Sequence, residues 1–179
     1  MRVHFRAGDH VFVDESKARG YILAATAVSQ IAIRQAEKAL RGLLKPGQRR
    51  LHFTRESDSR RRLIVSRMVE LEVAVSVWVA KNRADKEARP LLLEALAAEA
   101  ARALASRITI ESDASLDSAD RRIIAGVVRR EGVSLTYRHA APHEEPVLWV
   151  SDAIAWCYSR GGDWTRRVGP LVEDRVITF

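Results

Sequence analysis

The sequence predicts an α/β protein in which helices flank a mixed β-sheet. Two observations support this fold class. Runs rich in β-branched residues alternate along the chain with segments whose apolar residues follow the helical period. The first two of these runs are separated only by a short loop, which is typical of an antiparallel hairpin. We expect one domain over residues 1–179, with a core at about 9–160 and a tail at 161–179.

The first half of the chain begins with the hairpin. Residues 11–14 and 21–28 are its predicted strands, and Gly20 is expected to provide a positive φ in the loop between them. The apolar period of residues 31–44 predicts a helix that ends at the Lys-Pro-Gly sequence of residues 45–47.

Two further pieces precede the next strand. Residues 51–53 are interpreted as extended, and Thr54 is expected to cap a basic helix. The alternating, β-branched run at residues 72–80 predicts the third strand. The two helices therefore form an insertion after the second strand.

The second half continues the alternation of helices and strands. Its predicted elements are a helix over 90–106 beginning at Pro90, a strand over 107–111, a helix over 119–130 capped by Asp117 or Ser118, a strand over 133–137 and an apolar helix over 147–158. Residues 138–146 are expected to form a polar loop. The tail from Gly161 is expected to end in a short strand over 175–179.

Composition limits the classes of function. The net charge of +7 arises from 30 Lys and Arg against 23 Asp and Glu, a balance that favours a polyanionic partner but also fits an unpartnered, solvated surface. The single cysteine, Cys157, excludes an internal disulfide and a cysteine-based zinc site. No leader opens the chain and no apolar run reaches the roughly 20 residues that span a bilayer. We therefore expect a cytoplasmic protein without a membrane partner.

Three acids occupy positions where a core disfavours charge. Asp14 ends the first strand in phase with Phe12, and Glu111 ends the fourth strand in phase with Thr109. Asp152 lies on the almost wholly apolar last helix. An isolated carboxylate there costs on the order of several kcal/mol unless it is neutralised or paired. Convergence of the three around Mg²⁺ or Mn²⁺ removes that cost, because both ions prefer oxygen ligands.

Each acid also has an ordinary structural explanation. A strand that ends in Asp14, Glu15 and Ser16 is compatible with a turn or a helix cap. Asp152 is compatible with a cap near the start of its helix or with an arginine pair. Sequence alone leaves these alternatives open.

The order of elements, with acids on the first strand, the fourth strand and the last helix, resembles the ribonuclease H-like fold. Short motifs over about residues 9–160 resemble an uncharacterised bacterial and phage family, domain of unknown function thirty-eight hundred. The motifs are 11–16 (VFVDES), 51–53 (LHF), 110–112 (IES) and 151–156 (SDAIAW), followed by Arg160. Two positions depart from the family pattern, since Lys17 replaces a frequent glycine and Ser151 replaces a common alanine.

The resemblance implies a ribonuclease H-like mixed β-sheet and a metal-dependent nuclease that hydrolyses phosphodiester bonds in DNA or RNA. Asp14, Glu111 and Asp152 fall on the family's acidic positions and would ligate Mg²⁺ or Mn²⁺. Glu15 and His52 are further catalytic candidates. A histidine recurs in the family at the place of His52, where it would transfer a proton or contact substrate.

Several other acids are candidates for the same site. Ribonuclease H-like enzymes tend to carry a fourth acid on the helix after the third strand, where Glu94 or Glu99 is available. Asp113 and Asp120 are candidates to extend the acidic cluster. Alternatively, Asp113 ends a strand and Asp120 interacts favourably with a helix dipole.

Basic residues after Thr54 offer phosphate contacts that do not read sequence. The nucleic-acid-binding candidates are Arg55, Arg60, Arg61, Arg62 and Arg67, with Lys17 beside the acids. His139 and His143 lack the usual spacing of zinc ligands. The four tryptophans are expected in the core.

Two other classes of function compete with the nuclease. One is a catalytically silent nucleic-acid- or protein-binding module on the same fold. The other is a structural or assembly protein whose acids are ordinary caps and ion pairs. Metal-dependent hydrolysis that is lost on amidating the acids separates the nuclease from both.

Overall fold

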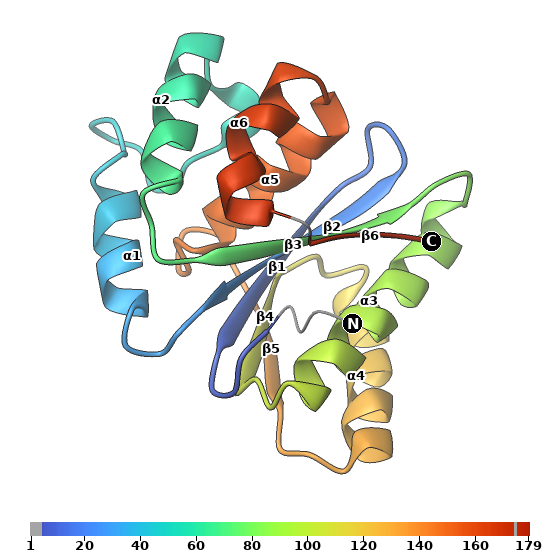
Figure 1. Cartoon of the computed structure of the whole chain (residues 1–179). Coiled ribbons are helices and arrows are strands. Elements are labelled where there is room, and N and C mark those ends of the chain that lie inside the picture. The colour runs from blue at the N-terminus through green and yellow to red at the C-terminus, as the bar shows by residue number, and fades with distance from the viewer. Residues whose placement is uncertain (1–4, 174) are drawn as a thin grey trace.

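The computed structural model describes residues 5–173 and 175–179, in which six strands form one mixed sheet (Figure 1). The strands are β1 His10–Ser16, β2 Tyr21–Val28, β3 Ala74–Ala80, β4 Arg107–Glu111, β5 Thr136–Ala140 and β6 Val176–Thr178. Their order across the sheet is β5-β4-β1-β2-β3-β6. Strand β2 is antiparallel to β1 and β3, whereas the other neighbouring pairs are parallel. The predicted mixed sheet and its opening hairpin are confirmed.

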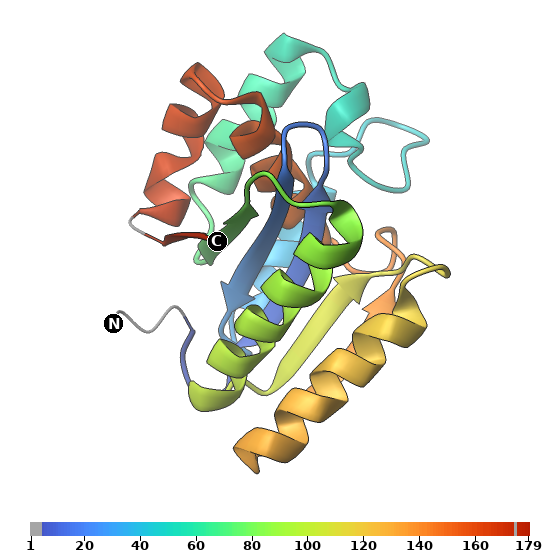
Figure 2. The same cartoon turned by 90° about the vertical axis from the view of Figure 1, so that its right-hand side faces the viewer.

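Helices cover both faces of the sheet (Figures 1 and 2). They are α1 Ile33–Arg41, α2 Asp58–Met68, α3 Asp85–Arg102, α4 Asp117–Glu131, α5 Leu148–Arg160 and α6 Asp163–Val172, with a 3₁₀ turn η1 at Phe53–Arg55. Helices α1, α2, α5 and α6 lie on one side, here the α5 face, and α3 and α4 lie on the other, the α3 face. Helices α1 and α2 form the predicted insertion between β2 and β3.

Strand β2 shows why the sheet needs helices on both sides. All of its residues are buried. Ile22 and Ala24 join the apolar cluster of the α5 face, and Leu23 and Ala25 join that of the α3 face. Because side chains alternate along a strand, a strand covered twice is apolar throughout.

The same alternation sets the directions of the acids on β1. Phe12 packs in the α5-face cluster, and Val11 and Val13 pack in the α3-face cluster. Asp14 therefore belongs to the α5 face and Glu15 to the α3 face. The predicted phase of Asp14 with Phe12 is confirmed.

Gly20 closes the β1–β2 hairpin with a φ of 84°. A Cβ at this position would lie 3.2 Å from the carbonyl oxygen of Ala80, so both conformation and space favour glycine. The predicted positive φ is confirmed.

Two predicted helix starts are wrong. Helix α3 begins at Asp85, so Pro90 lies inside it rather than in its first position. Helix α2 is capped by Ser57, whose Oγ accepts the N–H of Arg60 at 3.3 Å, while Thr54 lies in η1. The cap of α2 is thus set by the Ser57 hydrogen bond, whereas Ala84, which precedes α3, makes no side-chain capping hydrogen bond.

Two boundaries in the second half also differ. Asp117 and Ser118 are the first residues of α4 rather than its caps. Strand β5 covers 136–140 rather than 133–137, because its ladder pairs Thr136 with Arg107 and Ala140 with Glu111. The predicted polar loop therefore begins only after Ala140.

The segment predicted as a tail contains a helix. Val168, Leu171 and Val172 of α6 are buried in the α5-face cluster, where α6 packs against α5. Gly169 and Pro170 lie inside α6, and their low helix propensity explains why the sequence did not predict this helix. The predicted terminal strand is confirmed as β6, which pairs with β3. Within the described residues, none of the helices has both the length and the apolar character needed to cross a membrane.

Candidate functional site

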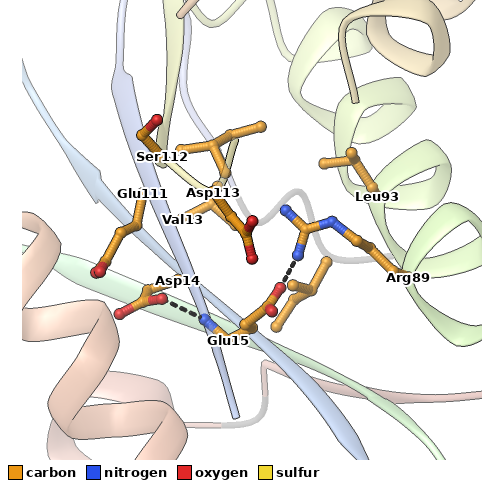
Figure 3. Close-up of a pocket in the computed structure, with 10 residues that line it drawn as sticks. Val13, Asp14, Glu15, Arg89, Leu93, Glu111, Ser112 and Asp113 are labelled. Carbon is orange, nitrogen blue, oxygen red and sulfur yellow. Dashed lines mark hydrogen bonds and ion pairs between the residues drawn. The ribbon is translucent and has the colours of Figure 1, made fainter. Parts of the chain in front are cut away.

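Two of the three predicted acids lie at the ends of adjacent parallel strands. The β1–β4 ladder pairs Val13 with Ile110, so Asp14 and Glu111 are the next residues of each strand. Ile110 packs on the α3 face, which turns Glu111 toward the α5 face, where Asp14 also lies. Register thus places these carboxyl groups side by side, as Figure 3 shows.

The third acid is held in place by a buried contact between α5 and the sheet. The Ser151 hydroxyl donates a hydrogen bond to the carbonyl oxygen of Phe12 at 2.8 Å, and its Oγ lies 2.7 Å from Oγ1 of Thr26. Ser151 is fully buried. Ser151 therefore anchors α5 beside β1, and Asp152 follows it directly.

The pKa shifts show that the three carboxyl groups interact. The pKa of Asp14 is raised well above its ordinary value by burial, by the charges of Glu111 and Asp152, and by a side-chain hydrogen bond to Glu111. Burial raises the pKa of Asp152 to about 6, with Glu111 adding to the rise. The N–H of Phe53 donates a hydrogen bond to Asp152 Oδ2 at 3.3 Å, which lowers the pKa of Asp152 and partly offsets this rise. Repulsion of this kind is relieved by a cation.

The donor set fits a hard divalent cation in chemistry, since all three groups are carboxylates. Within residues 5–173 and 175–179, however, no group of three His, Cys, Asp or Glu side chains is arranged to hold a metal ion. Asp14 Oδ1 instead accepts the N–H of Glu15 at 2.7 Å. The acids are therefore neighbours, but their side chains do not surround a common point.

A cavity of about 420 Å³ opens at this edge of the sheet (Figure 3). Asp14 and Glu111 lie on one side of it, and Glu15 with Arg89 lies on the other. Asp113 also lines it and is held in its loop by Ser115. Among the predicted extra acids, Asp113 is thus the one that shares the cavity with Asp14 and Glu111.

Glu15 does not join the acid cluster. Its carboxylate forms ion pairs with Arg89 and, at 2.8 Å, with Lys17, and it accepts a hydrogen bond from the Tyr21 hydroxyl at 2.6 Å. The alternation of side chains along β1 separates it from Asp14. We assign Glu15 to a network on the α3 face rather than to the candidate catalytic set.

That network continues through a buried ion pair that sequence did not reveal. Arg89 contacts Asp120 through Nε at 2.9 Å and Nη2 at 2.7 Å. Nε2 of His139 lies 3.1 Å from the same carboxylate and 3.5 Å from Asp117. Asp120 is therefore a structural partner of α3 and not a fourth acid. In the sequence Arg89 lies just before the helix predicted from Pro90, and no local pattern distinguishes it.

His52 lies near Glu111, in the loop before η1. Its Nδ1 is buried and has no hydrogen-bond partner among residues 5–173 and 175–179. The pKa of His52 is lowered by burial and by the charges of Arg50 and Arg55, while Glu111 opposes the shift. The imidazole is therefore neutral at pH 7 and can accept a proton.

Arg50 was not among the predicted site residues. Its Nη1 lies 3.4 Å from Glu111 Oε1. Its charge lowers the pKa of both Asp14 and Asp152. In the sequence Arg50 is one of many arginines of the chain and one of two in its loop, and no local pattern distinguishes it.

The predicted fourth acids on α3 lie elsewhere. Glu94 and Glu99 line a separate pocket with Trp78 and Arg130, and Glu94 pairs with Arg130 at 2.9 Å. Because α3 covers the α3 face, neither acid can approach Asp14, so this prediction is wrong.

The predicted basic surface is only partly free. Arg60 donates to the carbonyl of Leu43, and Arg61 donates to the carbonyls of Phe53 and Thr54 at 2.9 and 2.6 Å. The remaining candidates differ. Arg55 is exposed, Arg62 lies 5.9 Å from the ring of Trp164, Arg67 pairs with Glu70 at 3.2 Å, and Lys17 pairs with Glu15.

The tryptophans divide into two groups. Trp78 and Trp149 are buried, as predicted. Trp156 and Trp164 are partly buried and pack edge to face with each other at 5.2 Å. The guanidinium of Arg61 lies 4.5 Å from the ring of Trp156.

The comparisons with known proteins concern the fold. The structure resembles RNase HII from Archaeoglobus fulgidus, as solved in a PCNA:RNase HII complex, with a TM-score of 0.58 and 15% sequence identity. The match covers 90% of this chain and 76% of that chain. No protein-family model and no curated protein matches the chain. The structural similarity thus supports the predicted ribonuclease H-like fold, whereas no family model supports the resemblance to the narrower family.

Proposed function

We propose that this chain is a divalent-metal-dependent nuclease that hydrolyses phosphodiester bonds in DNA or RNA. The observation that carries the proposal is the β1–β4 register, which sets Asp14 beside Glu111 at the strand ends, with Asp152 of α5 near enough to raise the pKa of Asp14. Perturbed carboxyl groups beside a cavity are typical of functional sites. The fold likeness to RNase HII and the net charge of +7 favour a nucleic-acid substrate.

Under this proposal the acids hold Mg²⁺ or Mn²⁺, which would supply Lewis acidity and an activated water. Asp14 and Glu111 offer oxygens from the strand ends, and Asp152 offers a third carboxylate from α5. Asp113 is available at the cavity as a further carboxylate. Small side-chain rotations would have to bring the three carboxylates around one ion.

His52 is the candidate proton acceptor of the site. Its lowered pKa fits a neutral imidazole near Glu111. We expect His52→Ala to lower the turnover number more than it changes KM, because a proton acceptor acts in the transition state. Steady-state kinetics on a labelled oligonucleotide check this expectation.

A catalytically silent binding module is the second candidate. One observation favours it, namely that the described residues hold no three-ligand metal group. In that case nucleic-acid binding would be sensitive to salt, would survive amidation of the acids and would show no turnover.

The decisive experiment measures cleavage of labelled single- and double-stranded DNA and RNA in Mn²⁺ or EDTA. The variants are Asp14→Asn, Glu111→Gln and Asp152→Asn. Mutation of a residue that only supports a metal ligand already lowers metal affinity or activity by about 10- to 100-fold. We therefore expect the cleavage rate of each variant to be lower than that of wild type by more than about a hundredfold.

Glu70→Gln is the matched control, because Glu70 is an exposed carboxylate that pairs only with Arg67 among the contacts described. It should retain wild-type cleavage. Undiminished Mn²⁺-dependent cleavage in Asp14→Asn would contradict the proposal, and so would cleavage by wild type in EDTA.

A further inference from the structure

One cation reaches the acids from the loop between α1 and η1. Arg50 contacts Glu111 through a single nitrogen at 3.4 Å. The backbone beside it is fixed, since Leu51 is buried and the N–H of Phe53 donates to Asp152. Residues 50–53 thus contact two of the three acids, through the Arg50 side chain and the Phe53 backbone.

The Arg50–Glu111 pair is a loose one. The contact is long and one-pronged, and the side chains are 30% and 29% exposed. Such pairs contribute little to stability. Arg89, by comparison, makes a two-pronged contact with Asp120 at 2.7 and 2.9 Å and is 9% exposed. Arg50 can therefore leave Glu111 without disrupting the fold.

The charge balance around Arg50 is incomplete. Its positive charge lowers the pKa of Asp14 and Asp152, yet the pKa of each remains raised. One guanidinium thus faces three carboxyl groups. A divalent cation would neutralise Glu111 more fully than this pair does, and Arg50 would then be without its partner.

We propose that Arg50 is a phosphate-binding residue that exchanges partners, pairing with Glu111 in the metal-free protein and with a phosphate oxygen of the nucleic acid once Glu111 binds a divalent cation. The inference rests on the proposed function. The planar guanidinium matches a phosphate in geometry as well as in charge. Its contact with Glu111 places it beside the proposed metal site.

The first test uses Mn²⁺ alone, without nucleic acid, by titration calorimetry. Arg50→Ala removes a competing positive charge, so its Kd for Mn²⁺ should fall roughly three- to tenfold. Arg49→Ala is the matched control, because Arg49 is the adjacent, exposed arginine and its removal changes net charge equally. It should leave the Kd for Mn²⁺ near the wild-type value.

The second test measures binding of a labelled oligonucleotide by fluorescence anisotropy, with Ca²⁺ as the divalent cation or with EDTA. In Ca²⁺, Arg50→Ala should bind about tenfold more weakly than Arg49→Ala, with a salt slope smaller by about 1. In EDTA the difference in affinity between the two variants should be clearly smaller, since Glu111 then competes with phosphate for Arg50. Arg50→Lys keeps the charge but loses the two-pronged geometry, and should lie between them.

Three results would overturn the inference. One is equal Mn²⁺ affinity in Arg50→Ala and Arg49→Ala. Another is a loss of oligonucleotide binding in Arg50→Ala that is the same in Ca²⁺ and EDTA, because the contact would then be permanent. The third is an equal rate of Mn²⁺-dependent cleavage in Arg50→Ala and Arg49→Ala. This result would contradict the role of Arg50 but not the proposed nuclease activity. Absence of any Mn²⁺ binding in wild type would overturn both.

Discussion

The carboxyl group of Asp152 links the chemistry of single residues to stability. Its pKa is raised from an ordinary value near 3.8 to about 6, with burial as the largest cause. A group whose pKa is higher in the folded state stabilises that state only while protonated. Its contribution is therefore present below about pH 4 and is lost as the pH rises through about 6.

We predict that Asp152→Asn stabilises the metal-free protein at pH 7. The gain in the free energy of unfolding should be up to about 3 kcal/mol, because the amide cannot ionise. It should shrink toward zero as the pH falls from 6 to 4. Urea unfolding in EDTA across this pH range measures the gain and its pH dependence. If the variant is less stable than wild type at every pH, the ionised Asp152 does not destabilise the folded protein.

At the scale of elements, the α3-face network joins helices and strands that are far apart in the chain. Arg89 of α3 pairs with Asp120 of α4, and His139 of β5 approaches the same carboxylate. Asp117 of α4 in turn accepts the N–H of Asp113, just after β4. The loop that follows Glu111 is thus fixed from the opposite face of the sheet.

Removal of Arg89 should be strongly destabilising. Arg89→Met leaves Asp120 buried without its main partner, and we expect a loss of about 3–5 kcal/mol in the free energy of unfolding. Arg130→Ala removes an exposed pair with Glu94 and should cost no more than about 1 kcal/mol. Denaturant unfolding compares the two, and equal small losses would contradict a structural role for the buried pair.

Helix α6 should contribute to the core rather than fray from it. Leu171 is 3% exposed, so Leu171→Ala should cost about 2–5 kcal/mol. Leu63→Ala on α2 is the control, because Leu63 is 45% exposed and its truncation should change stability by about 0.5 kcal/mol or less. Thermal or urea unfolding measures both losses of stability. Equal losses in the two variants would contradict the packing of α6 in the core.

At the scale of the whole molecule, a cation that binds only the folded protein must raise its stability. At Mn²⁺ concentrations 100-fold above Kd the gain is about 2.7 kcal/mol. For a chain of this size that corresponds to a rise in Tm of roughly 5–10 °C. Calorimetry with and without Mn²⁺ should show the shift in wild type and a smaller or absent one in Asp14→Asn. An equal shift in both proteins would place the ion elsewhere.

Much of the fold was predictable because it depends on local periodicity. The hairpin, β4 and the opposite directions of Asp14 and Glu15 follow from alternation over a few residues. Element ends were less predictable, as the early start of α3 and the shift of β5 show. These ends are set by ladders and caps whose partners lie elsewhere in the chain.

The acids were predictable for a different reason. A carboxylate that follows a buried strand or lies on an apolar helix is conspicuous in any sequence, because burial of charge is unfavourable. Arg50 and Arg89 carry no such signal, since arginines are common in this chain and their partners lie 61 and 31 residues away.

The sequence by itself determined which residues alternate into a sheet, which follow a helical period and which acids lie where charge is disfavoured. Only the tertiary structure decided which groups meet: the Ser151 contact that sets α5 on β1, the arginine that faces Glu111, and the helix after Gly161. The physical reason is range. Periodicity is written within a few residues, whereas a carboxyl pKa, an ion pair and a packed helix depend on segments that only folding brings together.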